Sequence, residues 1–112
     1  HLAMEFIVWK VFSEMRLKFS HALKTEVWIA QTEQYLYLFQ PALESLQNAL
    51  YIPHSSASSG GILADSVSLL TEFMEGIRVM RQGLEGRKAL NCLLIQPLNK
   101  FYNQFGGVLN VF

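Results

Sequence analysis

Few residues in this sequence carry side chains suited to metal binding or nucleophilic catalysis. The three histidines, His1, His21 and His54, lie far apart, and none has a second histidine or a cysteine three or four residues away. Cys92 is the single cysteine, and no basic residue stands beside it to activate its thiol. Within the apolar string ALNCLLIQPL we expect Cys92 to be a small buried side chain. The sequence therefore predicts neither a metal site nor a reactive thiol.

The acidic residues and the glycines also lack the spacing of a catalytic or phosphate-binding site. Glu72 and Glu75 lie close together on one side of a predicted helix, where a solvated face explains them better than an acid–base pair does. The string SSGG is followed by Ile62 and Leu63, without the Lys-Ser or Lys-Thr of a P-loop. We therefore predict that the protein is not an enzyme and that it binds no cofactor.

The composition predicts one domain with a surplus of apolar side chains. A chain of 112 residues can build one hydrophobic core but is too short for two ordinary domains. Apolar residues make up 51% of it and charged residues only 16%, whereas soluble proteins average about a quarter charged. We expect the surplus to contact another protein, a second copy or a lipid surface. Nine basic residues balance nine acidic ones, so nucleic-acid binding is not expected.

The sequence shows no sign of export or of a membrane span. Residues 45–64 carry no formal charge, but Pro53, two glycines and several serines do not suit a transmembrane helix. The opening string HLAMEFIVWKVF lacks the successive regions of a signal peptide, and a single cysteine excludes an internal disulfide framework. We therefore expect an intracellular, cytoplasmic protein. We assign no function to residues 1–6, because they need not belong to the native chain.

Hydrophobic periodicity predicts that the chain begins with an amphipathic helix over residues 8–23. Its apolar residues recur at steps of about 100° and fall on one arc. A turn is expected near residues 24–26, because Glu26 would otherwise lie in the middle of that arc and Thr25 is suited to a cap. The predicted buried face consists of Val8, Phe12, Met15, Phe19, Ala22 and Leu23.

Residues 27–40 allow two secondary structures. Their β-branched and aromatic side chains would suit a strand, but no hairpin signal flanks them and the neighbouring segments are helical. We therefore prefer a helix that is buried on most faces. Pro41 suits the first turn of a further helix that ends near Ile52, and the alternative is a bend at Gln40 within one continuing helix.

The second half of the chain follows a Ser/Gly-rich loop over residues 53–61, which we expect to be flexible. Residues 63–84 again have a helical period, and Gly83 and Gly86 predict a break around its end. The predicted face of this helix consists of Leu63, Val67, Leu70, Met74, Ile77 and Leu84. In the last segment Pro97 marks a helix start or a kink, and the apolar face consists of Leu90, Leu94, Leu98, Phe101, Phe105 and Leu109. The predicted fold is an all-α antiparallel bundle of four or five helices in a single domain, with helical halves over residues 8–52 and 62–105.

The remaining signals are those of an interaction surface. Arg81 falls inside the apolar arc of its helix, so we expect its charge to pair with an acidic group on a partner or with Glu26 of this chain. A bundle of this size can hide only part of its aromatic side chains, and those left outside are typical interface anchors. The predicted interaction residues are Trp28, Arg81, Phe101, Tyr102, Phe105, Leu109 and Phe112.

These observations favour a non-catalytic helical module for protein–protein interaction or assembly. We expect a fragment or subunit of a larger protein or complex, acting as a scaffold or forming homo-oligomers or hetero-complexes. The alternative is a domain that binds the surface of a membrane through its aromatic helices and a basic cluster. That cluster consists of Arg78, Arg81, Arg87 and Lys88.

Overall fold

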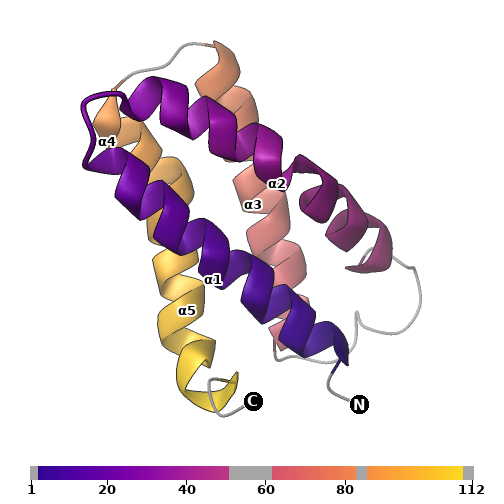
Figure 1. Cartoon of the computed structure of the whole chain (residues 1–112). Coiled ribbons are helices and arrows are strands. Elements are labelled where there is room, and N and C mark those ends of the chain that lie inside the picture. The colour runs from indigo at the N-terminus through magenta and orange to yellow at the C-terminus, as the bar shows by residue number, and fades with distance from the viewer. Residues whose placement is uncertain (1–2, 51–61, 83–85, 110–112) are drawn as a thin grey trace.

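The computed structural model describes residues 3–50, 62–82 and 86–109. The elements are α1 (Ala3–Leu23), α2 (Trp28–Leu50), α3 (Ile62–Gln82), α4 (Arg87–Leu90), the π-helical segment η2 (Asn91–Ile95) and α5 (Gln96–Leu109). The last three follow one another without a break and form one rod (Figure 1). Every element of the described residues is a helix, which confirms the all-α prediction. The predicted loop over residues 53–61 lies outside the described residues.

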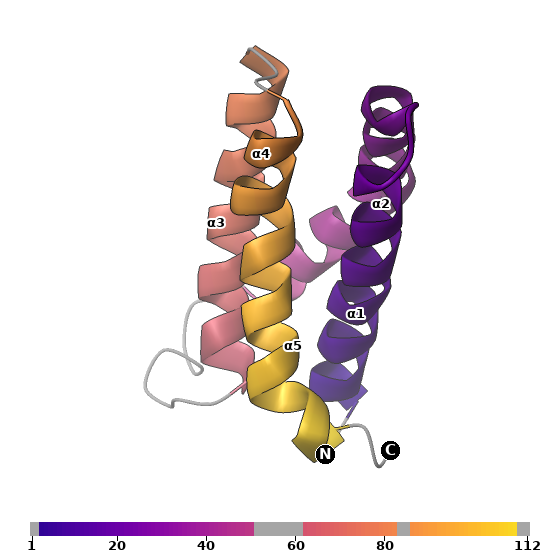
Figure 2. The same ribbon diagram turned by 90° about the vertical axis from the view of Figure 1, so that its left-hand side faces the viewer.

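The helices form two layers. Helices α1 and α2 make one antiparallel pair, and α3 pairs with the rod of α4, η2 and α5 in the other layer (Figure 2). The chain reverses between α1 and α2 in a short turn over residues 24–27, close to the predicted turn. Antiparallel neighbours are the expected result of such short connections, and the arrangement confirms the predicted bundle.

The core lies between the two layers and is built from the faces that periodicity predicts for the first and last helices. On α1, Val8, Phe12, Met15, Phe19 and Ala22 are buried. On the C-terminal rod, buried side chains include Leu90, Leu94, Leu98 and Phe101. The centre of the core is aromatic, because the ring of Phe19 lies 5.9–6.2 Å from the rings of Tyr35, Phe39 and Phe73. Aromatic pairs at this separation add attraction beyond the area that they bury.

Helix α2 continues through Pro41 rather than ending before it, so of the two alternatives the structure has the bend within one helix. Pro41 has no N–H to donate to the carbonyl of Tyr37, four residues earlier. Both residues are exposed, so water can solvate that carbonyl. The helix bends in its middle (Figure 1), and residues on both sides of the bend are buried: Leu36, Phe39, Leu43, Leu46 and Leu50.

The predicted face of α3 is confirmed only in part: Leu70 and Ile77 are buried, whereas Leu63 and Leu84 have side chains outside the described residues. The centre of the buried face lies about 60° of rotation about the helix axis from the predicted one, at 100° per residue. Met74, which was expected in the core, is 36% exposed, whereas Leu69 and Phe73 are buried. The helix turns Phe73, its largest apolar side chain, toward Phe19, where the two rings are 5.9 Å apart. The resulting buried residues are Ser66, Leu69, Leu70, Phe73, Ile77 and Met80.

A close contact between α3 and η2 accompanies this rotation. At Gly76 an added Cβ atom would lie 3.0 Å from the carbonyl oxygen of Leu93 and 3.1 Å from a methyl group of Leu94. Only a glycine lets the two backbones approach this closely. The π-helical segment precedes Pro97, and the N–H of Gln96 bonds to the carbonyl of Asn91 in the wider π pattern. The predicted irregularity at Pro97 therefore takes the form of a π-helical segment just before it, within a continuous helix.

Candidate interaction surfaces

Two of the predicted interaction residues belong to the core of the chain itself. Trp28, at the start of α2, is 9% exposed, and Phe101, on α5, is 5% exposed. The ring of Phe101 meets that of Phe12 edge to face at 5.1 Å. Burial of these side chains stabilises the monomer, so their predicted contact with a partner would require that core to open.

Tyr102 lies at the edge of the core, between α1 and α5. Its ring stacks on that of Trp9, with centroids 6.0 Å apart, and the guanidinium carbon of Arg16 lies 3.8 Å from the ring centroid. This is the geometry of a cation–π contact. Nε of Arg16 and Nε1 of Trp9 are buried, and neither has a hydrogen-bond partner in the described part of the chain. Tyr102 is thus held by contacts within the monomer.

The other predicted residues cannot be placed in the same detail. The side chains of Arg81, Phe105 and Leu109 lie outside the described residues, although their backbones belong to α3 and α5. Phe112 lies outside them altogether. The expected pairing of Arg81 with Glu26 therefore stays a prediction, and Glu26 is an exposed residue of the turn between α1 and α2.

Arg87 contacts that turn. Its Nε donates to the carbonyl of Leu23 at 3.0 Å, and one of its terminal nitrogens donates to the carbonyl of Thr25 at 2.6 Å. The guanidinium carbon also lies 5.6 Å from the ring centroid of Trp28. The last carbonyls of a helix have no intrahelical donor, and a cation at that end is favoured by the helix dipole. Arg87 therefore caps the C-terminal end of α1 from the other layer of the molecule.

Arg78 is also engaged within the chain. Its guanidinium forms an exposed ion pair with Glu75, one turn earlier on α3. The hydrogen bonds from Arg78 hold the pKa of the Glu75 carboxyl below its ordinary value, and the same bonds raise the pKa of Arg78. Two of the four cations in the predicted basic cluster are therefore occupied by this chain.

The outward face of α2 exposes apolar side chains to solvent. Tyr37 is 80% exposed and Leu38 is 55% exposed. Pro41 is exposed beside them, and two exposed carboxylates, Glu33 and Glu44, flank this side of the helix at the Tyr37 edge. We call this surface the α2 outer face, and it consists of Ala30, Gln34, Tyr37, Leu38, Pro41 and Ser45.

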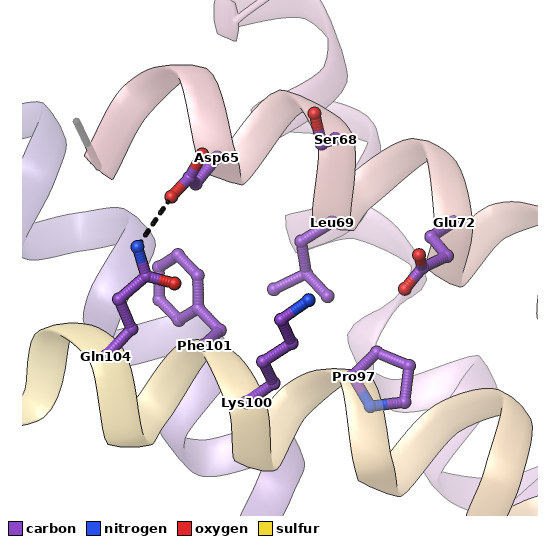
Figure 3. A pocket seen from close by; sticks show the side chains of 8 residues that line it. All are labelled: Asp65, Ser68, Leu69, Glu72, Pro97, Lys100, Phe101 and Gln104. Atoms are coloured by element: carbon purple, nitrogen blue, oxygen red, sulfur yellow. Dashed lines mark hydrogen bonds between the residues drawn. The ribbon is translucent and has the colours of Figure 1, made fainter. Parts of the chain in front are cut away.

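A second surface is hollowed. Two adjoining cavities of about 160 and 800 Å³ lie along the contact of α3 with the C-terminal rod and share Ser68, Glu72 and Pro97 in their walls. We call this depression the α3–α5 groove. Its α3 wall carries Asp65, which accepts a hydrogen bond from Nε2 of Gln104 at 3.0 Å. Figure 3 shows the narrower part of the groove.

In the narrower part of the groove one cation lies between two anions. Asp65 and Glu72 belong to α3, and the ammonium group of Lys100 points between them from α5 (Figure 3). The wider part is lined by Gly76, Val79, Leu93 and Pro97, together with Glu75. The groove therefore combines apolar with charged side chains, a combination found in surfaces that receive an amphipathic helix.

Cys92 is exposed at the wide end of the groove, so the expectation that it would be buried is wrong. The buried face of this rod is occupied by larger side chains, those of Leu90, Leu94 and Ile95. Cys92 lies between them in sequence but on the other side of the helix. The apolar residues next to Cys92 in the sequence therefore gave no indication that its side chain is exposed.

The α2 outer face was missed among the predicted interaction residues, although a signal for it existed. Residues 35–39 are apolar on every side of a helix, whereas a helix at the surface of a bundle buries only one face. Tyr35, Leu36 and Phe39 face inward, and Tyr37 and Leu38 are left outside. The groove has no such signal in the sequence, because its walls come from segments about thirty residues apart in the chain.

The described residues contain no group of three or more His, Cys, Asp and Glu side chains that could hold a metal ion. Over the same residues, no helix has the length and apolar character needed to cross a bilayer. Comparisons with protein-family models, with curated proteins and with solved structures gave no match to the chain. The surfaces themselves are therefore the basis for a functional proposal.

Proposed function

We propose that the protein is a non-catalytic helical module that binds other protein molecules. The observation that carries the proposal is the α2 outer face, where Tyr37 is 80% and Leu38 55% exposed beside the exposed Pro41, with Glu33 and Glu44 at its edge. Single exposed apolar residues are ordinary, but a contiguous apolar set rimmed by polar residues is typical of a binding surface. Tyrosine supports this reading, because it is enriched among the residues that dominate binding energy.

The alternative of a membrane-surface domain receives less support. That model needs a basic cluster next to an apolar face. Arg87 instead caps α1 and Arg78 pairs with Glu75, so these two cations are engaged within the chain. No observation favours this alternative over a protein partner.

Site-specific photo-crosslinking tests the proposal. A photoreactive phenylalanine analogue in place of Tyr37 should yield a discrete covalent adduct in cells, and mass spectrometry of the adduct identifies the partner. The matched control places the same analogue at Gln40, which is also exposed on α2 but lies outside the α2 outer face. Absence of an adduct from position 37, or equal adducts from both positions, would refute this surface as the binding site.

We also propose an intracellular, cytoplasmic setting, in which a single cysteine would remain a thiol. Imaging of a fluorescent fusion tests this directly. A signal confined to secretory compartments would contradict it.

A further inference from the structure

Two glutamates give the α2 outer face a negative rim. Glu33 and Glu44 are exposed, and α2 contains no lysine, arginine or histidine. Eleven residues separate them in the sequence, so at about 100° per residue they point within about 20° of each other. At a rise of about 1.5 Å per residue they lie about 16 Å apart along the helix. Tyr37, which is 80% exposed, lies between them along the same side.

No cation of the described residues balances this rim at close range, since neither carboxylate belongs to an ion pair there. Glu44 accepts a hydrogen bond from Nε2 of Gln40 at 3.2 Å, but that donor is neutral. Lys18 of α1 does approach α2, and its Nζ lies 5.6 Å from the ring centroid of Tyr35. Tyr35 lies about 160° around the helix from Tyr37, so Lys18 leaves the rim open to a partner.

The α2 outer face has the spacing of a helix–helix contact. Gln34, Leu38, Pro41 and Ser45 follow one another at intervals of four, three and four residues, which is the spacing of a packing seam. Leu38 is 55% exposed on this seam, and Tyr37 lies beside it. A second helix laid along the seam would therefore cover both of these large apolar side chains.

The rim defines the charges that such a helix needs. A partner helix has the same rise, so lysines or arginines eleven residues apart on it reach Glu33 and Glu44 together. Their long side chains can pack along apolar surface while the charged ends extend to the carboxylates. Because both ends of the rim are negative, the pattern accepts a helix with two cations in either direction. Charge complementarity therefore specifies the chemistry of the partner and not its polarity.

Two other occupants fit the same face poorly. If α2 of a second copy met this face, no cation would come with it, and juxtaposed carboxylates oppose association. An anionic membrane surface attracts basic segments, whereas this face offers it two carboxylates and no base. An apolar face with negative ends is instead complementary to an apolar face with positive ends.

We propose that the α2 outer face binds a basic amphipathic helix of a partner protein. Apolar side chains of that helix pack on Tyr37 and Leu38, and its lysines or arginines pair with Glu33 and Glu44. The inference deepens the proposed function, on which it rests, by naming the chemistry of the partner.

Charge variants that carry the photoreactive analogue at position 37 test the inference. Glu33→Lys and Glu44→Lys together reverse the rim. The matched control is Glu14→Lys with Glu72→Lys, which changes the net charge equally at exposed positions outside α2. All four positions are exposed, so circular dichroism should show unchanged helix content.

In dilute cell extract the adduct yield follows the bound fraction. It should fall about fourfold or more when the rim is reversed, because each exposed ion pair contributes a factor of about 1.4–5 and reversal replaces attraction by repulsion. The control should crosslink like the wild type. A milder variant, Glu33→Gln with Glu44→Gln, keeps the shape of the side chains. Its adduct yield should be lower than that of the wild type and less sensitive to added salt.

Mass spectrometry of the adduct then gives the sequence of the crosslinked segment. It should be helical in pattern, with lysine or arginine on both sides of its apolar residues. Substituting glutamate for those cations in the partner should restore the adduct with the reversed rim. An acidic or uncharged segment, a segment of this chain itself, or the absence of this rescue overturns the inference.

These failures differ from a failure of the proposed function. If position 37 forms an adduct whose yield is the same in the wild type and in both rim variants, the face binds a partner of other chemistry and this inference alone falls. If position 37 forms no adduct in the wild type, the proposed function falls and this inference with it.

Discussion

Arg87 provides a sharp test of how the two layers are joined, because it bonds to carbonyls more than sixty residues away in the sequence. Arg87→Ala removes the bonds to Leu23 at 3.0 Å and to Thr25 at 2.6 Å, together with the contact to the ring of Trp28. A hydrogen bond from a charged group contributes about 1.5–3 kcal/mol when it is protected from water. Arg87 is exposed, so solvent screening reduces each bond to about 0.5–1 kcal/mol.

The two bonds together predict a loss of about 1–2 kcal/mol in the free energy of unfolding. For a domain of roughly this size, each kcal/mol lowers the melting temperature by about 4–8 °C. Urea unfolding followed by far-UV circular dichroism measures the loss without depending on the fluorescence of Trp28, which the substitution itself changes. Arg87→Lys keeps the charge but not the planar fork, so it should lie between the wild type and Arg87→Ala.

Arg78→Ala is the matched control. It removes an exposed arginine whose bonds reach only Glu75 on the same helix, and such pairs contribute little. We expect its unfolding midpoint to stay close to that of the wild type. The reasoning is refuted if Arg87→Ala and Arg78→Ala have the same midpoint, because Arg87 would then not join the layers.

Three further substitutions probe local features of the structure. Gly76→Ala should lower the melting temperature, because overpacking against the Leu93 carbonyl costs about 1–3 kcal/mol and exceeds the gain of about 1 kcal/mol in helix propensity; a higher melting temperature would contradict the close contact. Thr32→Val should raise the free energy of unfolding by about 1 kcal/mol in chemical denaturation, since the buried hydroxyl has no partner in the described residues; a loss would reveal a hydrogen bond to it. Arg78→Gln should raise the pKa of Glu75 toward its ordinary value in an NMR titration. The pKa of Glu75 is depressed in the folded chain. The ion pair therefore stabilises the fold at pH values above the pKa of the unfolded chain, and this contribution disappears as the pH falls through the pKa of the folded chain. An unchanged titration of Glu75 would contradict the pairing.

Much of the fold was predictable because periodicity reports which residues share a face of a helix. The inward residues of α1 and of the C-terminal rod were identified from their 100° spacing. Helix α3 shows the limit of this signal. Its apolar residues occur on more than half of its circumference, so the spacing allowed two faces. The position of Phe19 on α1 determined which of them turned inward.

From the sequence one could predict a surplus of apolar side chains, but not the surfaces on which they lie. The composition indicated more apolar side chains than one core buries, but the aromatic residues chosen for a partner, Trp28 and Phe101, proved to be core. Large aromatic side chains bury the most area, so the core takes them first. Tyr37 and Leu38 remained outside because the inward side of α2 was already occupied by Leu36 and Phe39.

The sequence by itself determined that the chain is helical and which faces of its first and last helices are buried. It also determined that the chain has more apolar side chains than its core can bury. Only the tertiary structure decided that α2 continues through Pro41, that Cys92 faces solvent and that Arg87 caps α1. The reason is physical. Local spacing relates residues within one helix, whereas burial and capping depend on which neighbour a helix packs against. That choice is made by contacts between residues far apart in the chain.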